Sequence, residues 1–250
     1  DTAHFVDFDD NGFAMKAGRP GSYLFIKGSG AIRFYDIPIS VMKADVEKGQ
    51  IHLAVKIIST KTKALLAEEN ILVLRGPYRN GVHGISSIIK KKGKNLRTLI
   101  IAKGIGIAPG ILASREFQQK GVVDMVIETE KISEALIDDY LENGSGMIRY
   151  LSLTAKNSGR QLINIMKQNQ YENVILLVSD YYIDTIGRMI KKILPAADLA
   201  VSNNFRICCG EGLCGSCSVD TSGGDTVQMC KCQMNGEDLL NNVFYSRPSG

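Results

Sequence analysis

The hydrophobic pattern of the first part of the chain is that of short strands. Apolar and β-branched residues alternate with polar ones, and glycine-rich or charged turns separate the runs. The runs predict strands at residues 22–27, 33–41, 51–58 and 71–74. No helical periodicity of useful length interrupts them, and Gly76-Pro77 with Asn80-Gly81 ends the pattern. A small antiparallel β-barrel is the expected fold, because closing the sheet buries its edges.

From residue 97 onward, apolar strands alternate with amphipathic helices. The pattern predicts strands at 97–102, 122–128, 147–153, 174–179 and 198–202, and helices at 109–120, 133–142, 158–169 and 180–193. This alternation is typical of a parallel sheet covered by helices on both faces, with ligands at the carboxyl ends of the strands. The predicted fold class is therefore α/β plus β, with two domains followed by a C-terminal segment.

Composition and charge narrow the choice of partners. The 250 residues include 30 basic and 26 acidic side chains, for a formal charge of +4, and no basic block resembles a nucleic-acid footprint. No run approaches the roughly 18 apolar residues of a membrane span, and residues 1–30 lack a signal pattern. We therefore expect a cytoplasmic protein without a membrane span or a nucleic-acid partner. The first residue is Asp1 and not Met, which indicates processing, trimming or a missing leading segment.

All six cysteines lie between residues 208 and 232, which favours metal or redox use over a disulfide framework. Cys209, Cys214, Cys217 and Cys230 form a C-x4-C-x2-C-x12-C array, and this spacing suits a 2Fe-2S cluster. The intervening glycines are expected to adopt positive φ and to turn backbone N–H groups toward the inorganic sulfides. These glycines are Gly210, Gly212 and Gly215.

The alternative metal at this array is zinc. Cys214, Cys217, Cys230 and Cys232 have a spacing compatible with a tetrahedral structural zinc site. A zinc site leaves the C-G-x-G-x-C lead-in without an explanation, so the cluster is the preferred interpretation. The segment is also short and rich in glycine, so we expect it to depend on metal for its shape.

A glycine turn follows the first strand of the α/β region. Gly104, Gly106 and Pro109 lie between that strand and the next helix, where glycines permit close approach of a pyrophosphate and the helix N-terminus offers free N–H groups. The alternative is a glycine turn that simply packs the helix against the strand. The position of the turn at the first strand–helix junction favours nucleotide binding.

Glu128 ends the second strand of this region, 22 residues after Gly106. An acidic side chain there can accept hydrogen bonds from both adenosine ribose hydroxyls, which favours NAD over NADP. Two alternatives stay open: Glu128 is only a polar strand end, or the nearby Lys131 contacts a 2′-phosphate.

The order of these motifs resembles the ferredoxin reductase superfamily. P-I-S-V at 38–41 and T-K-A-L at 62–65 are expected to end barrel strands, and G-P-Y-R-N-G follows at 76–81. G-I-G-I-A-P at 104–109 and the cysteine array come after them. The match extends from about Pro20 to Asp238. Within the superfamily, the chain is most similar to the electron-transfer subunit of dihydroorotate dehydrogenase and to related FAD, NAD and 2Fe-2S subunits of bifurcating transhydrogenases and sulfide dehydrogenases.

This resemblance implies three functional parts. They are an FAD-binding β-barrel at 1–95, an NAD(P)-binding Rossmann-like domain at 96–204 and a 2Fe-2S segment at 205–250. The implied cofactor-binding residues of the first part are Ile37, Pro38, Ile39 and Ser40 along the flavin, Val55, Lys56, Ile57, Lys61 and Thr62 at the ribityl chain and pyrophosphate, and Gly76, Pro77 and Tyr78. The register of the family makes Cys209 the first cluster ligand and Cys230 the last, with Cys208 and Cys232 as neighbours.

The chain departs from the family at three places. Ile37 stands where an arginine is usual, Lys61-Thr62 replaces Gly-Thr, and Ser179-Asp180 replaces Gly-Pro. The first two weaken the usual pyrophosphate clamp, which Lys56, Lys61 or Lys63 would compensate only as point charges. An acidic Asp180 lies unfavourably beside nucleotide phosphates, so nucleotide affinity or selectivity is expected to differ.

The resulting hypothesis is an electron relay. NAD(P)H delivers a hydride to FAD, the 2Fe-2S cluster takes electrons singly, and a partner oxidoreductase docks around the cysteine loop, with either direction of flow allowed. No catalytic acid, base or nucleophile is required, and His4, His52 and His83 are interpreted as ordinary surface or turn residues. The alternatives are a stand-alone NADH-dependent flavin reductase and a redox sensor with a structural metal site.

Overall fold

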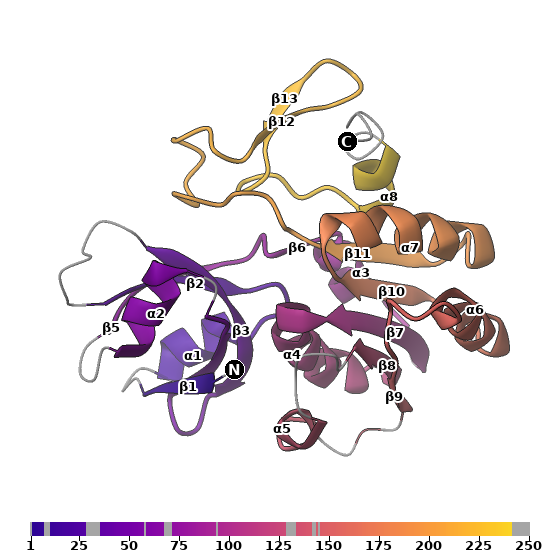
Figure 1. The fold of residues 1–250 in the computed structure, drawn as a ribbon, viewed down its shortest axis with the longest axis horizontal. Coiled ribbons are helices and arrows are strands. Elements are labelled where there is room, and N and C mark those ends of the chain that lie inside the picture. Colours follow the sequence, from indigo (N-terminus) through magenta and orange to yellow (C-terminus); the bar gives the residue numbers. More distant parts are fainter. Residues whose placement is uncertain are drawn as a thin grey trace.

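A computed structural model of the chain describes residues 2–7, 11–28, 36–57, 59–67, 72–93, 95–128, 134–141, 144 and 146–241. Figure 1 shows a curved antiparallel sheet beside a larger α/β unit, with the cysteine-bearing C-terminal residues lying across both. We call these parts the sheet domain, the α/β domain and the cysteine segment (residues 205–241). None of the helices in the described ranges has the length and apolar character needed to cross a bilayer.

The sheet domain contains five antiparallel strands in the order β1-β4-β3-β2-β5. Their bounds are β1 Thr2–Asp7, β2 Tyr23–Gly28, β3 Ile37–Asp45, β4 Gln50–Val55 and β5 Leu72–Tyr78. On β4 the alternating residues Ile51, Leu53 and Val55 are buried, as the two-residue period of a half-buried strand requires. The antiparallel sheet was predicted correctly. Among the described residues, β1 and β5 are the edge strands of the sheet and do not pair with each other. Closure of the sheet into a barrel therefore stays a prediction.

Two helices contradict the expectation of a helix-free first domain. Helix α1 (Asn11–Ala17) buries Ala14 and Ala17 in the core of the sheet domain, and α2 is Thr60–Ala67. Among the residues of α2 whose burial is described, only Thr62 and Leu65 are buried, and one apolar position per turn is too weak a signal to predict a helix. The stretch from Lys61 to Leu65, expected to end a strand, is therefore helical. The expected break at Gly76-Pro77 is also wrong, since both residues belong to β5.

The α/β domain is a six-stranded sheet in the order β6-β11-β10-β7-β8-β9. Its strands are β6 Val82–His83, β7 Leu96–Lys103, β8 Gly121–Glu128, β9 Ile148–Tyr150, β10 Asn173–Leu177 and β11 Asp198–Ser202. All neighbours are parallel except β6 and β11. The strand order reverses between β7 and β10, and ligands of such sheets bind at the carboxyl ends of the strands that flank this reversal. Strand β6 joins this sheet although it precedes residue 96.

Helices cover both faces of the α/β sheet, as predicted. They are α3 Ile85–Lys90, α4 Ile107–Gln118, α5 Glu134–Asp138, α6 Ser158–Gln168 and α7 Asp180–Ile193. Alternate residues of β7 enter different cores: Leu99 and Ile101 pack with α6 and α7, whereas Ile100 and Ala102 pack with α3 and α4. Helix α5 and strand β9 are shorter than the predicted 133–142 and 147–153, and residues 133 and 142 lie outside the described ranges.

Helix α4 joins the two domains. Its side chain Leu112 belongs to the core of the sheet domain, whereas Met42 of β3 belongs to the core of the α/β domain. Each domain thus inserts a buried apolar side chain into the other's core. Since both side chains are buried, the position of β3 relative to α4 is set by close packing.

The cysteine segment packs on the α/β domain. It contains the short hairpin β12 Ser218–Asp220 and β13 Thr226–Gln228 and the helix α8 Gly236–Leu239. Buried Met229, Leu239 and Leu240 share a hydrophobic core with α6, α7, β10 and β11. Leu240 lies against Gly187 of α7, where an added Cβ would be 3.0 Å from it.

His83 is not a surface or turn histidine as expected, because it lies in β6 and is fully buried. Its ring meets that of Phe205 edge-on, with 6.4 Å between the centroids. Burial lowers the pKa of His83 to about 4, since a low-dielectric site disfavours the imidazolium. His52 is half-buried against Tyr140, and the side chain of His4 lies outside the described part of the structure.

Acid is therefore expected to destabilise the protein through His83. The unfolded chain binds the proton near pH 6.5 and the folded chain near pH 4, so stability is lost as pH falls through this window, by up to about 3 kcal/mol. Urea unfolding at several pH values should show this slope in the wild type and a flatter one in His83→Leu. An equal slope in both proteins would contradict the assignment.

Candidate functional site

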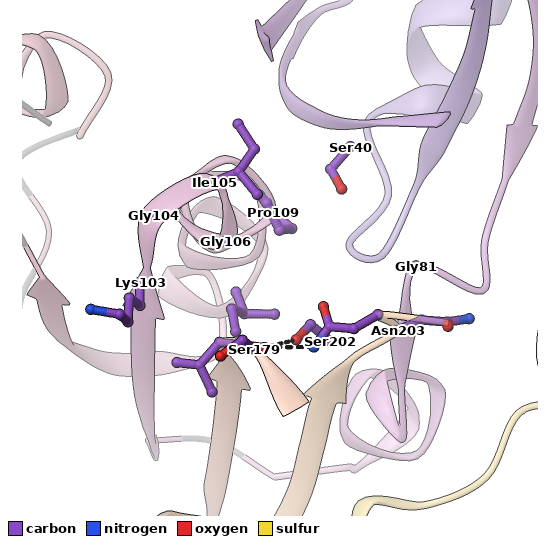
Figure 2. A pocket seen from close by; sticks show the side chains of 13 residues that line it. Ser40, Gly81, Lys103, Gly104, Ile105, Gly106, Pro109, Ser179, Ser202 and Asn203 are labelled. Carbon is purple, nitrogen blue, oxygen red and sulfur yellow. Dashed lines mark hydrogen bonds between the residues drawn. The ribbon is translucent and has the colours of Figure 1, made fainter. Parts of the chain in front are cut away.

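A cavity of about 290 Å³ opens where the strand order of the α/β sheet reverses. Figure 2 shows Ser40 of the sheet domain on one side and the glycine turn after β7 on the other. The lining residues come from the ends of β7, β10 and β11, from the glycine turn and from the sheet domain: Ser40, Gly81, Lys103, Gly104, Ile105, Gly106, Pro109, Leu177, Val178, Ser179, Ser202, Asn203 and Asn204. The cavity thus lies at the carboxyl ends of the strands, where ligands were predicted to bind, and ligand binding there stays a prediction.

The two glycines of the turn serve different purposes. Gly104 has a φ of 58°, and an added Cβ would meet nothing within 4 Å, so one side of the backbone is open. Gly106 has ordinary helical backbone angles, but an added Cβ would lie 2.1 Å from the carbonyl oxygen of Leu177. Gly106 is therefore required for close packing of α4 against β10, whereas Gly104 leaves room for a ligand. A 3-10 turn, Gly104–Gly106, leads directly into α4, and the Ile107 N–H donates to the Gly104 carbonyl. The start of this turn has no side-chain cap, so the N–H groups that could meet an anion are those of the turn itself.

Glu128 lies at the predicted strand end, but it is buried and already paired. Lys103, its neighbour across the β7–β8 ladder, donates a hydrogen bond to the Glu128 carboxylate. The Lys103 ammonium also lies 5.2 Å from the ring centroid of Tyr182. Lys103 lines the cavity and Glu128 does not, so a ribose would reach the carboxylate only if Lys103 moved aside. Lys131 falls outside the described residues.

Of the residues that the family resemblance assigned to FAD, only Ser40 lines the cavity. Ile37, Pro38 and Ile39 precede it on β3, paired with β2. Val55 is buried in the core of the sheet domain, Lys56 is half-buried and Ile57 is exposed, all at the end of β4. Gly76, Pro77 and Tyr78 lie at the end of β5.

Lys61 and Thr62 lie in the first turn of α2. The Thr62 hydroxyl accepts a hydrogen bond from the Ser59 N–H at 3.1 Å and donates one to the Ser59 carbonyl at 3.0 Å. The Thr62 N–H in turn donates to the Ser59 hydroxyl at 3.3 Å, which is the reciprocal capping common at helix starts. Thr62 thus organises the start of α2, and Lys61 is exposed beside it.

The Ser179-Asp180 pair begins α7. Ser179 lines the cavity, and Asp180 is not among the lining residues. Asp180 lies in the first turn of α7, where a negative charge interacts favourably with the positive end of the helix dipole. This acidic residue therefore has a structural reason to be there.

Four of the six cysteines form two neighbouring pairs. Cys209 lies beside Cys214 and Cys217 lies beside Cys230, close enough that Cys214 affects the pKa of Cys209 and Cys217 affects that of Cys230. The Cys230 N–H also donates to Cys217 Sγ at 3.4 Å. The backbone N–H of Cys214 lowers the pKa of Cys209 to about 6, whereas burial raises the pKa of Cys230 to about 11. These four are the predicted cluster ligands.

Cys232 stands apart from these pairs. Burial alone raises its pKa, with no contribution from another cysteine. Cys208 is exposed at the opposite end of the segment. Within the described ranges, no group of three or more His, Cys, Asp or Glu side chains is gathered closely enough to hold a single metal ion. The separation of Cys232 from the other thiols does not favour the tetrahedral zinc alternative.

The glycines of the cysteine segment have the predicted backbone. Gly210, Gly212 and Gly215 have φ values of 71°, 73° and 70°. An added Cβ at Gly210 would lie 2.7 Å from the Phe25 ring, and one at Gly212 would lie 2.5 Å from the Gln228 side-chain oxygen. Other side chains would therefore meet both strain and steric overlap at these two turns.

An unsatisfied hydroxyl lies beside the cysteine pairs. Tyr23 is buried, and its hydroxyl has no hydrogen-bond partner among the described residues. Its ring stacks on Tyr78 with 5.3 Å between the centroids. Burial raises the pKa of Tyr23 strongly, and Cys230, Tyr78 and Cys217 raise it further because they are close. A buried donor without an acceptor is costly, so this hydroxyl is an available donor for a group held by the cysteines.

Sequence reasoning missed several cavity residues and the contacts of the cysteine segment. Lys103, Ser202, Asn203 and Asn204 follow or end predicted strands, so the rule that ligands bind at carboxyl ends could have identified them. No local pattern marks Tyr23, which belongs to the site because of strand pairing.

Sequence comparison finds distant relatives among electron transfer subunits. No protein-family model matches the chain. The electron transfer subunit of dihydroorotate dehydrogenase B (NAD(+)) from Fusobacterium nucleatum is 23% identical over 243 residues, which cover 94% of this chain and 86% of that protein. The probable electron transfer subunit of the same enzyme from Methanocaldococcus jannaschii is 26% identical over 188 residues, covering 70% of this chain and 63% of that protein.

Structural comparison gives the fold. The structure of an NADH-dependent reduced ferredoxin-NADP oxidoreductase, solved in work on flavin-based electron bifurcation, matches with a TM-score of 0.72 and 15% identity over 97% of this chain and 85% of that chain. The chain has the ferredoxin reductase-like fold and is a distant homologue of dihydroorotate dehydrogenase B electron transfer subunits. The resemblance predicted from the motifs is confirmed at this level.

The different roles of the two glycines are testable. Gly106→Ala is expected to cost about 3 kcal/mol of stability, because its Cβ meets backbone that cannot yield easily. Gly104→Ala is expected to cost about 1 kcal/mol from its positive φ, while its methyl group occupies the cavity edge and weakens nucleotide binding. Urea unfolding and fluorescence titration with NADH measure the two effects. Full nucleotide affinity in Gly104→Ala would contradict the role of Gly104.

Proposed function

We propose that the chain is the electron-transfer subunit of an NAD(P)H-dependent oxidoreductase, relaying electrons between NAD(P)H, FAD and a 2Fe-2S cluster to or from a partner. The observation that carries this proposal is the arrangement of the four thiols in two pairs beside the sheet domain. Strand β2 pairs Tyr23 with Ser40 of β3 and with Tyr78 of β5, so one row of residues extends from the cavity to the cysteine segment. The distant homology to electron transfer subunits supports it.

FAD would lie between the two domains. Ile37, Pro38, Ile39 and Ser40 would contact the flavin, and the Ser40 hydroxyl already points toward the cavity (Figure 2). The remainder of the FAD molecule would be held by Val55, Lys56 and Ile57, by Lys61 and Thr62 at the start of α2, and by Gly76, Pro77 and Tyr78. Bound FAD accepts a hydride and releases electrons singly, which is the chemistry that links a nucleotide to a cluster. The exposed Lys61 at the start of α2 would supply a point charge to the pyrophosphate, which partly offsets the missing arginine at Ile37.

The nicotinamide nucleotide would bind at the switch point. The open backbone of Gly104 and the N-terminus of α4, with Gly106 and Pro109, would face its pyrophosphate. Lys103 would neutralise phosphate charge, and its departure would free Glu128 for a ribose. Residues of the chain thus bind and orient the nucleotide, and no side chain acts as an acid or base.

The cluster would be held by Cys209 and Cys214 on one iron and by Cys217 and Cys230 on the other. Two thiol pairs meet the requirement of four thiolates for two irons, and the unpartnered Tyr23 hydroxyl would donate to one of their sulfurs. The cluster takes and gives one electron at a time. Leu213, which is 86% exposed between Cys209 and Cys214, offers an apolar contact to a partner over this site.

Anaerobic visible spectroscopy tests the proposal. Flavin and iron–sulfur bands are expected in the purified protein and should bleach together on stepwise addition of NADH. Cys214→Ser is expected to lose iron and sulfide, whereas Cys232→Ser, the matched control, should retain both. A colourless protein would contradict the relay. Flavin bleaching without a cluster signal would favour the flavin reductase, and negligible NADH turnover with artificial acceptors would favour the redox sensor.

The Tyr23 hydroxyl gives a second test. In cluster-free protein Tyr23→Phe is expected to raise the unfolding free energy by about 1 kcal/mol, because it removes an unsatisfied buried donor. In the cluster-loaded protein, Tyr23→Phe should leave the unfolding free energy unchanged or lower it, because a hydrogen bond from the hydroxyl to sulfur is lost. Urea unfolding of both forms measures this difference, with the exposed Tyr181→Phe as control. An equal gain in both forms would mean that the hydroxyl does not face the cluster.

A further inference from the structure

Arg75 of β5 contacts both the sheet domain and the cysteine segment. Its Nε and Nη2 atoms donate to the Asp36 carboxylate at 3.2 and 3.0 Å. The guanidinium carbon lies 4.3 Å from the centroid of the Phe25 ring. These contacts fix the plane of the guanidinium group, which is a rigid fork of donors.

The remaining nitrogen of Arg75 points to the first cysteine turn. Arg75 Nη1 donates to the carbonyl oxygen of Cys209 at 2.8 Å and lies 3.5 Å from the Glu211 carboxylate. It also donates to the Tyr78 hydroxyl. The backbone of the turn that begins with Cys209 is therefore held by a side chain of the proposed FAD-binding domain.

Glu211 extends this contact to the other end of the array. Its carboxylate accepts a hydrogen bond from the Tyr78 hydroxyl and forms an ion pair with Lys231 at 3.1 Å. Glu211 is two residues after Cys209, and Lys231 directly follows Cys230. Glu211 thus connects the turn of the first predicted ligand to the turn of the last.

The turn also lies flat on an aromatic surface. The Phe25 and Tyr78 rings meet edge-on with 5.3 Å between the centroids, and Gly210 lies directly on them. An added Cβ at Gly210 would be 2.7 Å from Phe25 and 3.1 Å from Tyr78. Polar contacts from Arg75 and apolar contact through Gly210 therefore act on the same three residues, Cys209 to Glu211.

We propose that Arg75 is a positioning residue that seats the Cys209 turn on the sheet domain, and that Glu211 sets the spacing between the Cys209 and Cys230 turns. This inference rests on the proposed function, because the turns matter as the two ends of a cluster site. The ion pairs involved are partly exposed, and such pairs add little to global stability. Their effect is therefore local order at the cysteines.

Hydrogen exchange of the cluster-free full-length protein, followed by mass spectrometry, tests the seating directly. Arg75→Gln is expected to speed exchange at residues 208–216 at least tenfold and to leave residues 228–232 nearly unchanged. Glu211→Gln is expected to speed exchange at both turns, because it removes the charge that pairs with Arg75 and with Lys231. Arg188→Gln, which removes a comparable ion pair with Asp184 on α7, is the matched control and should change neither. Unchanged exchange in Arg75→Gln, or equal changes in the control, would overturn the proposal.

The midpoint potential of the cluster in the metal-loaded protein is a second measurement, which a purely structural role of Arg75 would leave unchanged. Arg75→Gln is expected to lower the midpoint potential of the cluster, because a positive charge near it is removed. A tenfold change in the electron-sharing equilibrium corresponds to 59 mV for one electron. Arg75→Lys should restore the potential but not the slow exchange, because it keeps the charge and loses the fork. A wild-type protein without iron would overturn the proposed function and leave the exchange experiment to decide the seating alone.

Discussion

The packing of α4 against β3 is the constraint on which the rest of the molecule depends. Leu112 enters the core of one domain and Met42 enters the core of the other. Close-packed interiors tolerate little displacement, so this exchange fixes the two sheets relative to each other. Ser40 is two residues from Met42, and Gly104 and Gly106 immediately precede α4. The cavity that these residues line is therefore a consequence of the interdomain packing and not of a separate loop arrangement.

The pairing of β3, β2 and β5 extends this constraint to the cysteine segment. In the sheet domain, Ser40, Tyr23 and Tyr78 are directly opposite one another on β3, β2 and β5. Neighbouring residues in a sheet share a face, so the end of the row that reaches the cavity is rigidly connected to the end that contacts Glu211. A nucleotide or flavin between the domains and a metal group among the cysteines would then keep a fixed separation.

Much of the α/β domain could be predicted from the sequence, because its signals are local. Buried β7 and the amphipathic α7 have strong periodic patterns, and their bounds were predicted to within two residues. Helix α2 was missed, because its start depends on reciprocal hydrogen bonds between Ser59 and Thr62 and not on a hydrophobic stripe. His83 was interpreted wrongly, since its burial results from the pairing of β6 with β11, more than a hundred residues later in the chain.

In the candidate site, too, features with local sequence signals were predicted and features that depend on long-range contacts were not. The spacing of Cys209, Cys214, Cys217 and Cys230 identified the thiols that the structure pairs. The glycine motif was recognised, but its two alternatives, ligand approach and helix packing, apply to different residues, Gly104 and Gly106. Only the distance between Gly106 and Leu177 of a distant strand reveals this. Contacts that depend on long-range pairing, such as those of Tyr23 and Arg75, leave no trace in local sequence.

The cysteine segment is attached by two kinds of interaction with different consequences. Buried Met229, Leu239 and Leu240 pack on the α/β domain, and such apolar contacts stabilise without strongly specifying direction. Hydrogen bonds from Arg75 to the Cys209 carbonyl and from Asn80 to the Cys230 carbonyl, at 2.8 Å each, specify direction because they require alignment. The α/β domain thus anchors the segment, while β5 and the turn after it orient its cysteines. Any shift between the two domains would consequently change the geometry of the thiols before it released the segment.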